Sequence, residues 1–322
     1  MTAVRTLLDA IGDTPLVELA RLGRGLPVPV FAKCEHDNPG GSIKDRIAKA
    51  IVDDADARGV LRPGMTLVEA TAGNTGLGLA MVAATRGYRL VCVMPEKMSV
   101  DKRTALTDVG AEVVVTPNAP LSSPDNFRAV ARRLAAQDGH FATDQFDNPV
   151  NVRCHETTTA VEILAQVGGP IGAFVVGAGT GGTITGVGRA LKATQPSVRV
   201  VLADPVGSAL AAWVETGELG PDGSYAVEGI GGSAPPGNLD RRVIDAAEVV
   251  SDDESFAMVE RLVREEGLLV GASAGTNVVA ALRVAARGGL AGPVVTVLPD
   301  DWDRYHSQPW MQGRRGWTPI DA

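Results

Sequence analysis

The chain has 322 residues, of which 45% are hydrophobic and 21% charged, a composition typical of a globular protein. Its formal net charge of -8 at pH 7 argues against nucleic acid or an anionic membrane surface as a partner. No apolar run reaches the roughly 20 residues that a membrane span requires. The three cysteines are odd in number and far apart, so they predict neither a disulfide framework nor a zinc site. We therefore expect a cytoplasmic protein without a metal site, and the four histidines are interpreted as surface or capping residues.

Short apolar runs alternate with alanine-rich helical stretches along the chain. Strands are predicted at residues 28–32, 65–69, 90–94, 112–116, 173–176, 198–204 and 294–298. Helices are predicted at residues 47–57, 77–85, 100–109, 125–137, 157–167, 183–193, 255–266 and 275–286. The run at 90–94 (LVCVM) is apolar throughout, as expected where helices cover both faces of a parallel sheet. The alternation predicts a doubly wound α/β fold, and the Gly- and Pro-rich residues 205–242 predict a long loop.

A lysine stands where a glycine-containing loop turns into a helix, in the segment 38–46 (NPGGSIKDR). Ser42 is the expected N-cap, which places Lys44 in the first helical turn. The positive end of the helix dipole disfavours a second positive charge at that place. Lys44 is therefore a candidate for an amine that gives up its proton readily and attacks an aldehyde. On these residues alone, an ordinary exposed lysine is the alternative.

Three segments of small residues follow, each ahead of a predicted helix. Residues 71–76 (TAGNTG) follow a strand, where ligands bind in open α/β sheets, and Asn74 offers an amide to a ring or carbonyl oxygen. Residues 177–183 (GAGTGGT) can present several N–H and hydroxyl donors to one phosphate. Residues 271–275 (GASAG) carry Ser273, whose hydroxyl can reach a ring nitrogen. Taken singly, each segment also suits a plain turn or cap; together with Lys44 they describe one ligand, pyridoxal 5′-phosphate.

The second segment has a rival interpretation as an NAD site. Gly177, Gly179 and Gly182 match G-x-G-x-x-G, and the next strand ends in Asp204, at about the spacing of a dinucleotide fingerprint. However, the match begins past mid-chain and leaves too little strand–helix material for a full dinucleotide domain. It also gives Lys44 no role. An NAD-dependent oxidoreductase therefore stays as the alternative class of enzyme, beside a non-catalytic relative that acts as a binding partner or sensor.

From about residue 7 to residue 311, the chain resembles the fold-type II pyridoxal-phosphate β-replacement enzymes, the cysteine synthases and cystathionine β-synthases. Residues 41–46 (GSIKDR) resemble their lysine motif, residues 73–76 (GNTG) their substrate-carboxylate loop, and residues 179–183 (GTGGT) their phosphate loop. Further matches lie at residues 12–16, 94–99, 116–117, 123–124, 228–231, 265–269 and 310–311. The finer matches are closest to the cystathionine β-synthase catalytic core, without its haem or regulatory domains.

The resemblance implies a tryptophan synthase β-like fold of two doubly wound α/β domains, with the cofactor in the cleft between them. Residues 1–40 and 148–322 would form the larger domain, which binds the cofactor phosphate. Residues 41–147 would form a smaller, mobile domain that carries the substrate-carboxylate loop. It also implies a homodimer whose partners are a small-molecule amino-acid substrate and a small nucleophile.

The resemblance also implies the roles of individual residues. Lys44 would be the catalytic residue and the covalent anchor of the cofactor. The other implied cofactor-binding residues are Asn74, Gly179, Thr180, Gly181, Gly182, Thr183 and Ser273. The implied substrate-binding residues are Thr71, Ala72, Gly73, Asn74, Thr75, Gln145, Phe146 and Gly231.

The implied reaction is β-replacement on L-serine or an O-activated serine through an aminoacrylate, catalysed by a lyase or transferase in which Lys44 moves the Cα proton. Homocysteine as the nucleophile would make the enzyme cystathionine β-synthase-like. Sulfide would make it a cysteine synthase (O-acetylserine sulfhydrylase), and another nucleophile a specialised β-substituted alanine synthase. The chain departs from cystathionine synthases at Phe146 and Gly232, where these often carry tyrosines, and it has no arginine near residues 204–207, where phosphoserine-using relatives place one.

Overall fold

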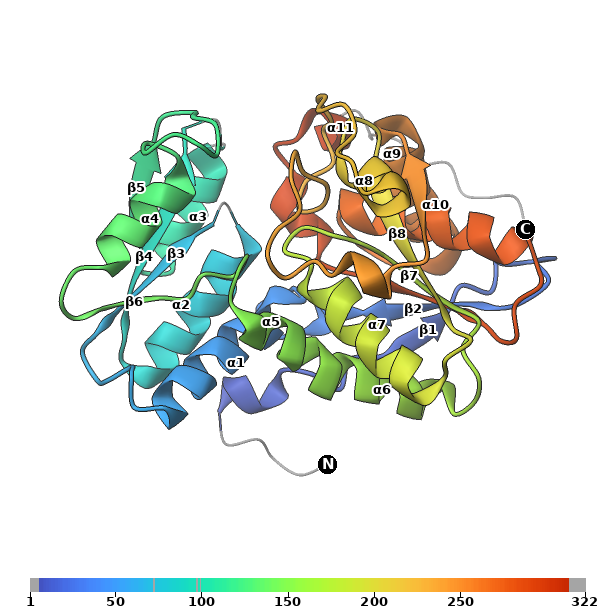
Figure 1. Ribbon diagram of the computed structural model, residues 1–322, viewed down its shortest axis with the longest axis horizontal. Coiled ribbons are helices and arrows are strands. Elements are labelled where there is room, and N and C mark those ends of the chain that lie inside the picture. Colours follow the sequence, from blue (N-terminus) through green and yellow to red (C-terminus); the bar gives the residue numbers. More distant parts are fainter. Residues whose placement is uncertain (1–5, 72, 97, 99, 313–322) are drawn as a thin grey trace. The chain divides into compact units, whose positions relative to one another are not determined.

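The computed structural model describes residues 6–71, 73–96, 98 and 100–312, so that residues 72, 97 and 99 of the matched segments lie outside the described part. The chain divides into two compact units. Unit 1 holds the described residues up to Gly12 together with Asn38–Asn151, and unit 2 holds Asp13–Asp37 together with the described residues from Val152 onward (Figure 1). The contacts thus group residues 6–12 with the smaller unit, whereas the expected division places them in the larger domain.

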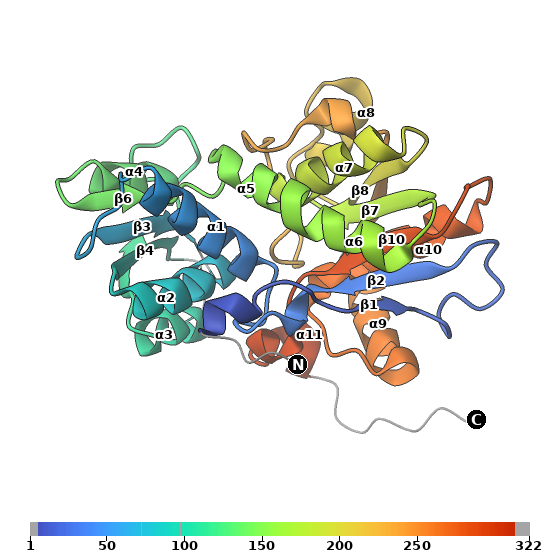
Figure 2. The ribbon, with the colours of Figure 1, turned by 90° about the horizontal axis from the view of Figure 1, so that it is seen from below.

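Unit 1 is built on a four-stranded parallel sheet in the order β5-β4-β3-β6. Its strands are β3 (Thr66–Ala70), β4 (Arg89–Pro95), β5 (Glu112–Thr116) and β6 (His140–Ala142). Helix α4 (Phe127–Ala135) packs on one face, and α2 (Asn74–Arg86) and α3 (Val100–Asp108) lie on the other side (Figure 2). Helix α1 (Lys44–Ala57) packs on α2. Alternate residues of β4 serve the two faces, because Val91 and Val93 share a buried cluster with Ala131 of α4, and Cys92 shares one with Leu79 of α2. This two-sided burial explains why the strand is apolar throughout.

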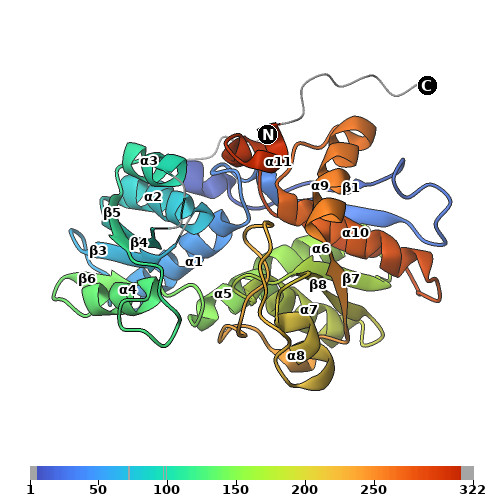
Figure 3. The ribbon, with the colours of Figure 1, turned by 90° about the horizontal axis from the view of Figure 1, so that it is seen from above.

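Unit 2 is built on a six-stranded sheet in the order β1-β2-β10-β7-β8-β9, parallel except for the antiparallel pair β1–β2. Its strands are β1 (Leu16–Glu18), β2 (Val30–Cys34), β7 (Ala173–Gly177), β8 (Arg199–Pro205), β9 (Ala246–Val250) and β10 (Val294–Leu298). Helices α6 (Ala160–Val167) and α7 (Gly182–Thr194) lie side by side in Figure 2, and Figure 3 shows α9 (Asp252–Arg261) beside α10 (Ala272–Ala286). Helix α10 forms the centre of the core, since its Val278 and Ala281 pack with Ala32, Val175 and Val201 of the sheet.

Short helical elements complete the described chain. They are the α-helices α5 (Pro149–Cys154), α8 (Leu210–Thr216) and α11 (Pro309–Gln312), the π-helical turns His155–Thr159 and Leu262–Glu266, and the 3-10 turns Leu7–Ala10, Glu35–Asp37, Arg241–Val243 and Trp302–Tyr305. Within the described residues, no helix combines the length and the apolar character needed to cross a membrane.

The doubly wound α/β architecture predicted from the sequence is confirmed. One local prediction is wrong: Ser42 is not the N-cap of the first long helix. Helix α1 begins at Lys44 with Ile43 in the N-cap position, and the Ser42 hydroxyl accepts the backbone N–H of Lys44 at 3.2 Å. Lys44 nevertheless lies in the first turn, as the sequence predicts.

Candidate functional site

The loop before Lys44, in unit 1, is held by a buried carboxylate. Asp45 is 0% exposed, and its Oδ2 accepts the backbone N–H of Gly40 at 2.6 Å. A Cβ atom at Gly40 would lie 2.5 Å from Asp45 Oδ1, so only glycine allows this approach. Asn38 Oδ1 accepts the N–H of Gly12 at 2.9 Å at the start of the same loop. Lys44 therefore follows a loop that is fixed at both ends.

Helix α1 packs closely on helix α2, which begins at Asn74. A Cβ atom at Gly78 of α2 would lie 3.2 Å from both the carbonyl oxygen of Lys44 and the Cβ of Ala48. Just ahead of α2, the backbone N–H of Gly73 donates to Thr71 Oγ1 at 3.3 Å. The first turns of both helices, with Lys44 and Asn74, thus belong to one packed pair.

Two segments that the resemblance assigns to the substrate meet inside unit 1. Thr75 Oγ1 donates to Gln145 Oε1 at 2.5 Å, across 70 positions of the sequence. The side-chain amide of Gln145 donates to the carbonyl oxygen of Ala70 at 3.2 Å. Both Thr75 and Gln145 are buried. The loop around Thr71 and the segment around Gln145 are therefore joined by buried polar side chains.

A buried glutamate holds the segment around Gln145 in place. Glu69 is 1% exposed, and its Oε2 accepts the Thr143 hydroxyl at 2.6 Å and the backbone N–H of Gln145 at 3.0 Å. Burial raises the pKa of the Glu69 carboxyl to about 7, although these two hydrogen bonds oppose the rise. Its Oε1 has no hydrogen-bond partner among the described residues. Sequence reasoning gave Glu69 no role; the available signal was a charged residue inside an apolar strand.

Phe146 is covered by a guanidinium group. Arg128 Cζ lies 3.5 Å from the centroid of the Phe146 ring, a cation–π contact. The two side chains line a cavity of about 20 Å³ together with Glu69 and Asp144, large enough for about one water molecule. Burial lowers the pKa of Arg128. At this position the chain thus has a phenyl ring without a hydroxyl, and the Arg128 guanidinium stacks on that ring.

In unit 2, the glycine loop between β7 and α7 can be built only from small residues. A Cβ atom at Gly179 would lie 2.1 Å from the carbonyl oxygen of Gly229, and one at Gly181 would lie 2.7 Å from the backbone of Leu239. Gly181 also has a φ of +81°, which favours glycine. Helix α7 begins at Gly182, and its first N–H groups have no acceptor within the helix. Such a loop at a helix start fits a phosphate.

The segment Glu228 to Gly231 lies against this loop. The backbone N–H of Gly231 donates to the carbonyl oxygen of Ala178 at 2.9 Å. The ring of Tyr225 packs on Gly231, because a Cβ atom there would lie 2.7 Å from the Tyr225 hydroxyl oxygen. Burial, with the nearby Asp204 carboxylate, raises the pKa of Tyr225 to about 12, so the phenol stays protonated. Tyr225 lies in the long loop that the sequence predicts, and no sequence signal singled it out.

Ser273 lies inside the first turn of α10 and is 3% exposed; the sequence pattern places it just ahead of a helix. One turn later, Asn277 fastens this helix to the glycine loop. Its Oδ1 accepts the N–H of Gly177, and its amide nitrogen donates to the carbonyl oxygen of Val297. Sequence reasoning missed Asn277, although an asparagine in an alanine-rich helix was a signal.

The prediction that the histidines are surface or capping residues is wrong for His155, which is 2% exposed. His155 Nε2 lies 3.2 Å from the hydroxyl oxygen of Thr183, at the end of the glycine loop. The π-helical turn that carries His155 contacts α7, so the ring is enclosed between helices. Sequence spacing carries no sign of this burial.

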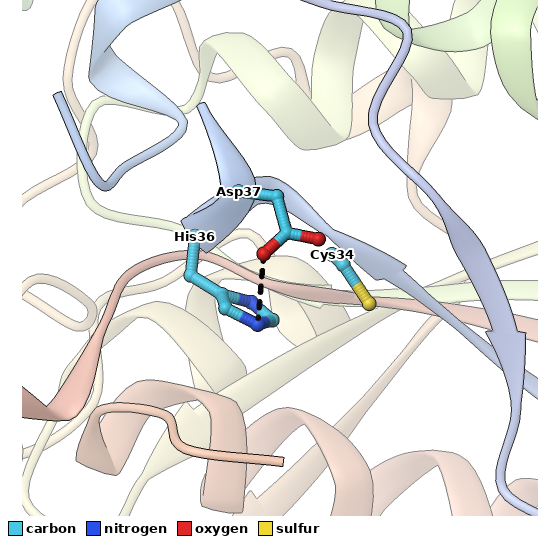
Figure 4. Close-up of side chains that lie close together, drawn as sticks. All are labelled: Cys34, His36 and Asp37. Atoms are coloured by element: carbon cyan, nitrogen blue, oxygen red, sulfur yellow. Dashed lines mark ion pairs between the residues drawn. The ribbon is translucent and has the colours of Figure 1, made fainter. Parts of the chain in front are cut away.

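Cys34, His36 and Asp37 offer three possible metal-ligand atoms that lie within 4.8 Å of one another (Figure 4). His36 Nε2 is 3.5 Å from Asp37 Oδ1, longer than a good hydrogen bond. Burial and the acidic neighbours raise the pKa of the Cys34 thiol to about 12. Asp37 is exposed. The expectation of a protein without a metal site stays a prediction.

Comparison with known proteins identifies the family. The family described as "Pyridoxal-phosphate dependent enzyme" matches residues 7–300. A cystathionine β-synthase of Apis mellifera is 42% identical over 322 residues, 98% of this chain and 64% of its own length. A cysteine synthase 1 of Emericella nidulans is 43% identical over 321 residues, 97% of this chain and 87% of its own length. The crystal structure of an O-ureido-L-serine synthase is 40% identical, with a TM-score of 0.88 and coverage of 98% of both chains.

The chain therefore belongs to the family of pyridoxal-phosphate dependent enzymes. The resemblance to the fold-type II cysteine synthase and cystathionine β-synthase group is confirmed, and with it pyridoxal phosphate as the cofactor. The chain spans 64% of the length of the Apis mellifera relative and 55% of that of a cystathionine β-synthase of Oryctolagus cuniculus.

Proposed function

We propose that this chain catalyses β-replacement on L-serine or an O-activated serine, with a thiol as the nucleophile. The contact between Thr75 and Gln145 carries this proposal. These residues, 70 positions apart, are both implied in binding the substrate carboxylate, and their side chains lie 2.5 Å from each other. This pairing fixes Thr75 against Gln145, so that the two segments implied in binding the substrate carboxylate are held together.

The residues present fit pyridoxal phosphate. Gly179 and Gly181 let the 179–183 loop pack directly on the backbone of Gly229 and Leu239, and a glycine loop held in this way at a helix start would suit a phosphate. Lys44 would bind the aldehyde carbon covalently, Asn74 would donate to the ring oxygen, and Ser273 would face the ring nitrogen. When bound, the cofactor supplies an electron sink that acidifies the Cα–H and lets the β-substituent leave.

The side chains of unit 1 would do the remaining work. The substrate carboxylate would be bound by Thr71, Gly73, Asn74 and Thr75, with Gln145 on the other side. Ala72, implied with them, lies outside the described residues. The Lys44 amine would take the proton from Cα and return it after the nucleophile has added. Exclusion of water from the site would prevent hydrolysis from competing with addition of the nucleophile.

The proposal includes the implied roles of the two units. Unit 2 would bind the cofactor phosphate, and unit 1 would be the mobile domain that carries the substrate loop. We also propose a homodimer in the cytoplasm. The roles of the two units and the homodimer rest on the family resemblance, and the cytoplasmic location rests on the three scattered cysteines.

Two observations bear on the nucleophile. The Tyr225 hydroxyl on Gly231 supplies a polar group beside a segment implied in substrate binding, which favours an amino-acid thiol such as homocysteine. Phe146, with no hydroxyl and with Arg128 on its ring, favours a small nucleophile such as sulfide. Relatives named cystathionine β-synthase, cysteine synthase and O-ureido-L-serine synthase occur in the same family. We take the cystathionine-forming reaction as the first candidate and cysteine synthesis as the second.

The test combines the colour of the protein with a matched pair of lysine variants. The purified protein should be yellow and should bleach with borohydride. Lys44→Ala should lower turnover by at least about 100-fold, the usual contribution of a general base. Lys49→Ala, in the same helix, removes only a partly exposed pair with Asp53 and should leave turnover unchanged. Mass spectrometry should then detect the product in which the nucleophile has replaced the β-substituent. The first substrates to be compared are serine, O-acetylserine and O-phosphoserine, each with sulfide, homocysteine, cyanide or an amine.

Normal turnover and normal visible absorbance of Lys44→Ala would overturn the mechanism. The NAD interpretation of the glycine loop is set aside, because the chain belongs to the family of pyridoxal-phosphate dependent enzymes.

A further inference from the structure

A buried histidine connects the glycine loop of unit 2 to the helical turn behind it. His155 Nε2 lies 3.2 Å from Thr183 Oγ1, and His155 Nδ1 lies 3.0 Å from Thr159 Oγ1. All three groups belong to unit 2. His155 and Thr159 are the first and last residues of a π-helical turn, a feature that occurs frequently at functional sites.

A glycine of α7 makes this approach possible. A Cβ atom at Gly186 would lie 2.3 Å from the carbonyl oxygen of Val152 and 3.0 Å from the Cβ of His155. Because Gly186 follows Thr183 by less than one helical turn, the imidazole is held against the start of α7. The contact between His155 and Thr183 is thus built into the packing of two helices.

Three consecutive threonines follow in this turn, and the last one differs from the first two. Thr157 Oγ1 donates to the carbonyl oxygen of Arg153 at 2.9 Å, and Thr158 Oγ1 donates to that of Cys154 at 2.7 Å. These are the usual bonds of a helical threonine to the residue four positions earlier. Thr159 Oγ1 instead lies beside the ring nitrogen of His155. Its hydroxyl is therefore available to fix the state of the ring.

The hydrogens decide what Thr183 can offer. A neutral imidazole donates from one nitrogen and accepts at the other, and a hydroxyl has a single hydrogen. If Nε2 accepted from Thr183, that hydroxyl would direct its lone pairs at the bound anion. If Nε2 donates to Thr183 Oγ1 and Nδ1 accepts from Thr159, Thr183 keeps its hydrogen for a phosphate oxygen. Of these two arrangements of the neutral ring, only the second suits an anion.

We propose that His155 is a positioning residue that keeps the Thr183 hydroxyl a donor to the cofactor phosphate, and that Thr159 selects the required form of the imidazole. The proposal rests on the proposed assignment of the 179–183 loop to the phosphate. The negative charge of the phosphate would then be stabilised by neutral hydrogen-bond donors and by the N-terminus of α7.

The experiment measures the Kd of the apoenzyme for pyridoxal phosphate and for pyridoxal, which lacks the phosphate. Thr183→Val and His155→Asn should each weaken pyridoxal phosphate about 10- to 100-fold, the effect of losing one hydrogen bond to a charged group. His155→Gln should stay within about threefold of the wild type, because a glutamine amide can place an N–H near the position of Nε2, whereas an asparagine amide reaches only that of Nδ1. Pyridoxal should bind all variants alike.

Two further readouts separate positioning from packing. The ³¹P resonance of the bound cofactor should shift in His155→Asn and return toward the wild-type position in His155→Gln. Thr159→Val should weaken pyridoxal phosphate, whereas Thr157→Val, a matched change at an exposed threonine of the same turn, should not. The double variant His155→Asn/Thr183→Val should bind no more weakly than Thr183→Val alone, since both act on one hydrogen bond.

The outcomes against the inference are distinct from those against the proposed function. Unchanged binding by Thr183→Val would refute the phosphate assignment itself. Weak binding by Thr183→Val with wild-type binding by His155→Asn would refute the role of His155 alone. Equal losses for His155→Asn and His155→Gln, with pyridoxal also affected, would show a packing role and overturn it. If His155→Asn does not fold, equal affinities of Thr159→Val and Thr157→Val would overturn it.

Discussion

The side-chain oxygen of Asn277 accepts the backbone N–H of Gly177 at 2.7 Å, across 100 positions of the sequence. The amide nitrogen of the same side chain donates to the carbonyl oxygen of Val297 at 2.8 Å. Asn277 is 0% exposed, so neither backbone group can turn to water instead. One amide thus joins helix α10 to the ends of strands β7 and β10, and it fixes the helix that carries Ser273 against the start of the glycine loop.

Asn277→Ala should therefore destabilise the protein by about 2 to 4 kcal/mol, because it leaves a buried N–H and a buried carbonyl without partners. Asn277→Asp should also destabilise, since a carboxylate can accept from Gly177 but cannot donate to Val297. The measurement is urea unfolding followed by circular dichroism. Asn118→Ala, at an exposed asparagine, is the control and should stay within about 0.5 kcal/mol. A loss no larger than that control would show that the amide does not hold the helix.

Gly179→Ala should abolish firm cofactor binding. The added Cβ would lie 2.1 Å from the carbonyl oxygen of Gly229, a backbone atom, so the loop itself must move. We expect the variant to lose pyridoxal phosphate on gel filtration while its far-ultraviolet spectrum stays native. Gly169→Ala adds the same methyl group at a glycine with no atom within 4 Å and should keep the cofactor. Retention of cofactor by both variants would count against the loop geometry.

Glu69→Gln should change how stability depends on pH. Burial raises the folded-state pKa of Glu69 from 4.5 to about 7, so the folded protein holds this proton more tightly than the unfolded chain. The wild type should consequently lose stability relative to Glu69→Gln as pH rises from about 4.5 to about 7, by about 3 kcal/mol in all. Urea midpoints of both proteins at pH 5, 6, 7 and 8 test this. Parallel pH profiles for the two proteins would contradict the raised pKa.

Tyr225→Phe should separate the candidate nucleophiles. Removal of the hydroxyl beside Gly231 should raise the KM for homocysteine about 2- to 10-fold, the effect of one lost hydrogen bond, and leave the KM for sulfide unchanged. Steady-state kinetics with each nucleophile, at a saturating first substrate, provide the comparison. If both KM values stay the same, the Tyr225 hydroxyl does not contact the nucleophile.

Apolar runs and helical periodicity in the sequence predicted most of the strands and helices. The run at residues 90–94 became β4 (Arg89–Pro95), because a strand buried on both faces must be apolar at every position. Strand β6 (His140–Ala142) has three residues, too few for any period to show. Strand β9 (Ala246–Val250) lies at the sheet edge with mixed exposure, so its pattern is weak.

Candidate site residues could be identified from the sequence where they belong to a motif at a strand–helix junction. They could not be identified where their environment depends on tertiary contacts. Lys44, Asn74 and the glycine loop each stand at a strand–helix junction, which a sequence displays directly. Glu69 and His155 contact residues that are distant in sequence, Gln145 for the first and Thr183 for the second. Neither partner can be inferred until the fold has brought the segments together.

The strand order of unit 2 also has a consequence for synthesis of the chain. Strand β10 lies between β2 and β7, and its Val294 pairs with Val30 on one side and with Ala173 on the other. Every strand of unit 1 precedes β10 in the chain, so that sheet can pair while unit 2 still lacks its central member. A nascent chain that stops before Val294 would hold β1–β2 and β7–β8–β9 as separate ribbons with two unpaired edges facing the gap. Those edges are the place where a chaperone or an aggregating neighbour would find an incomplete molecule.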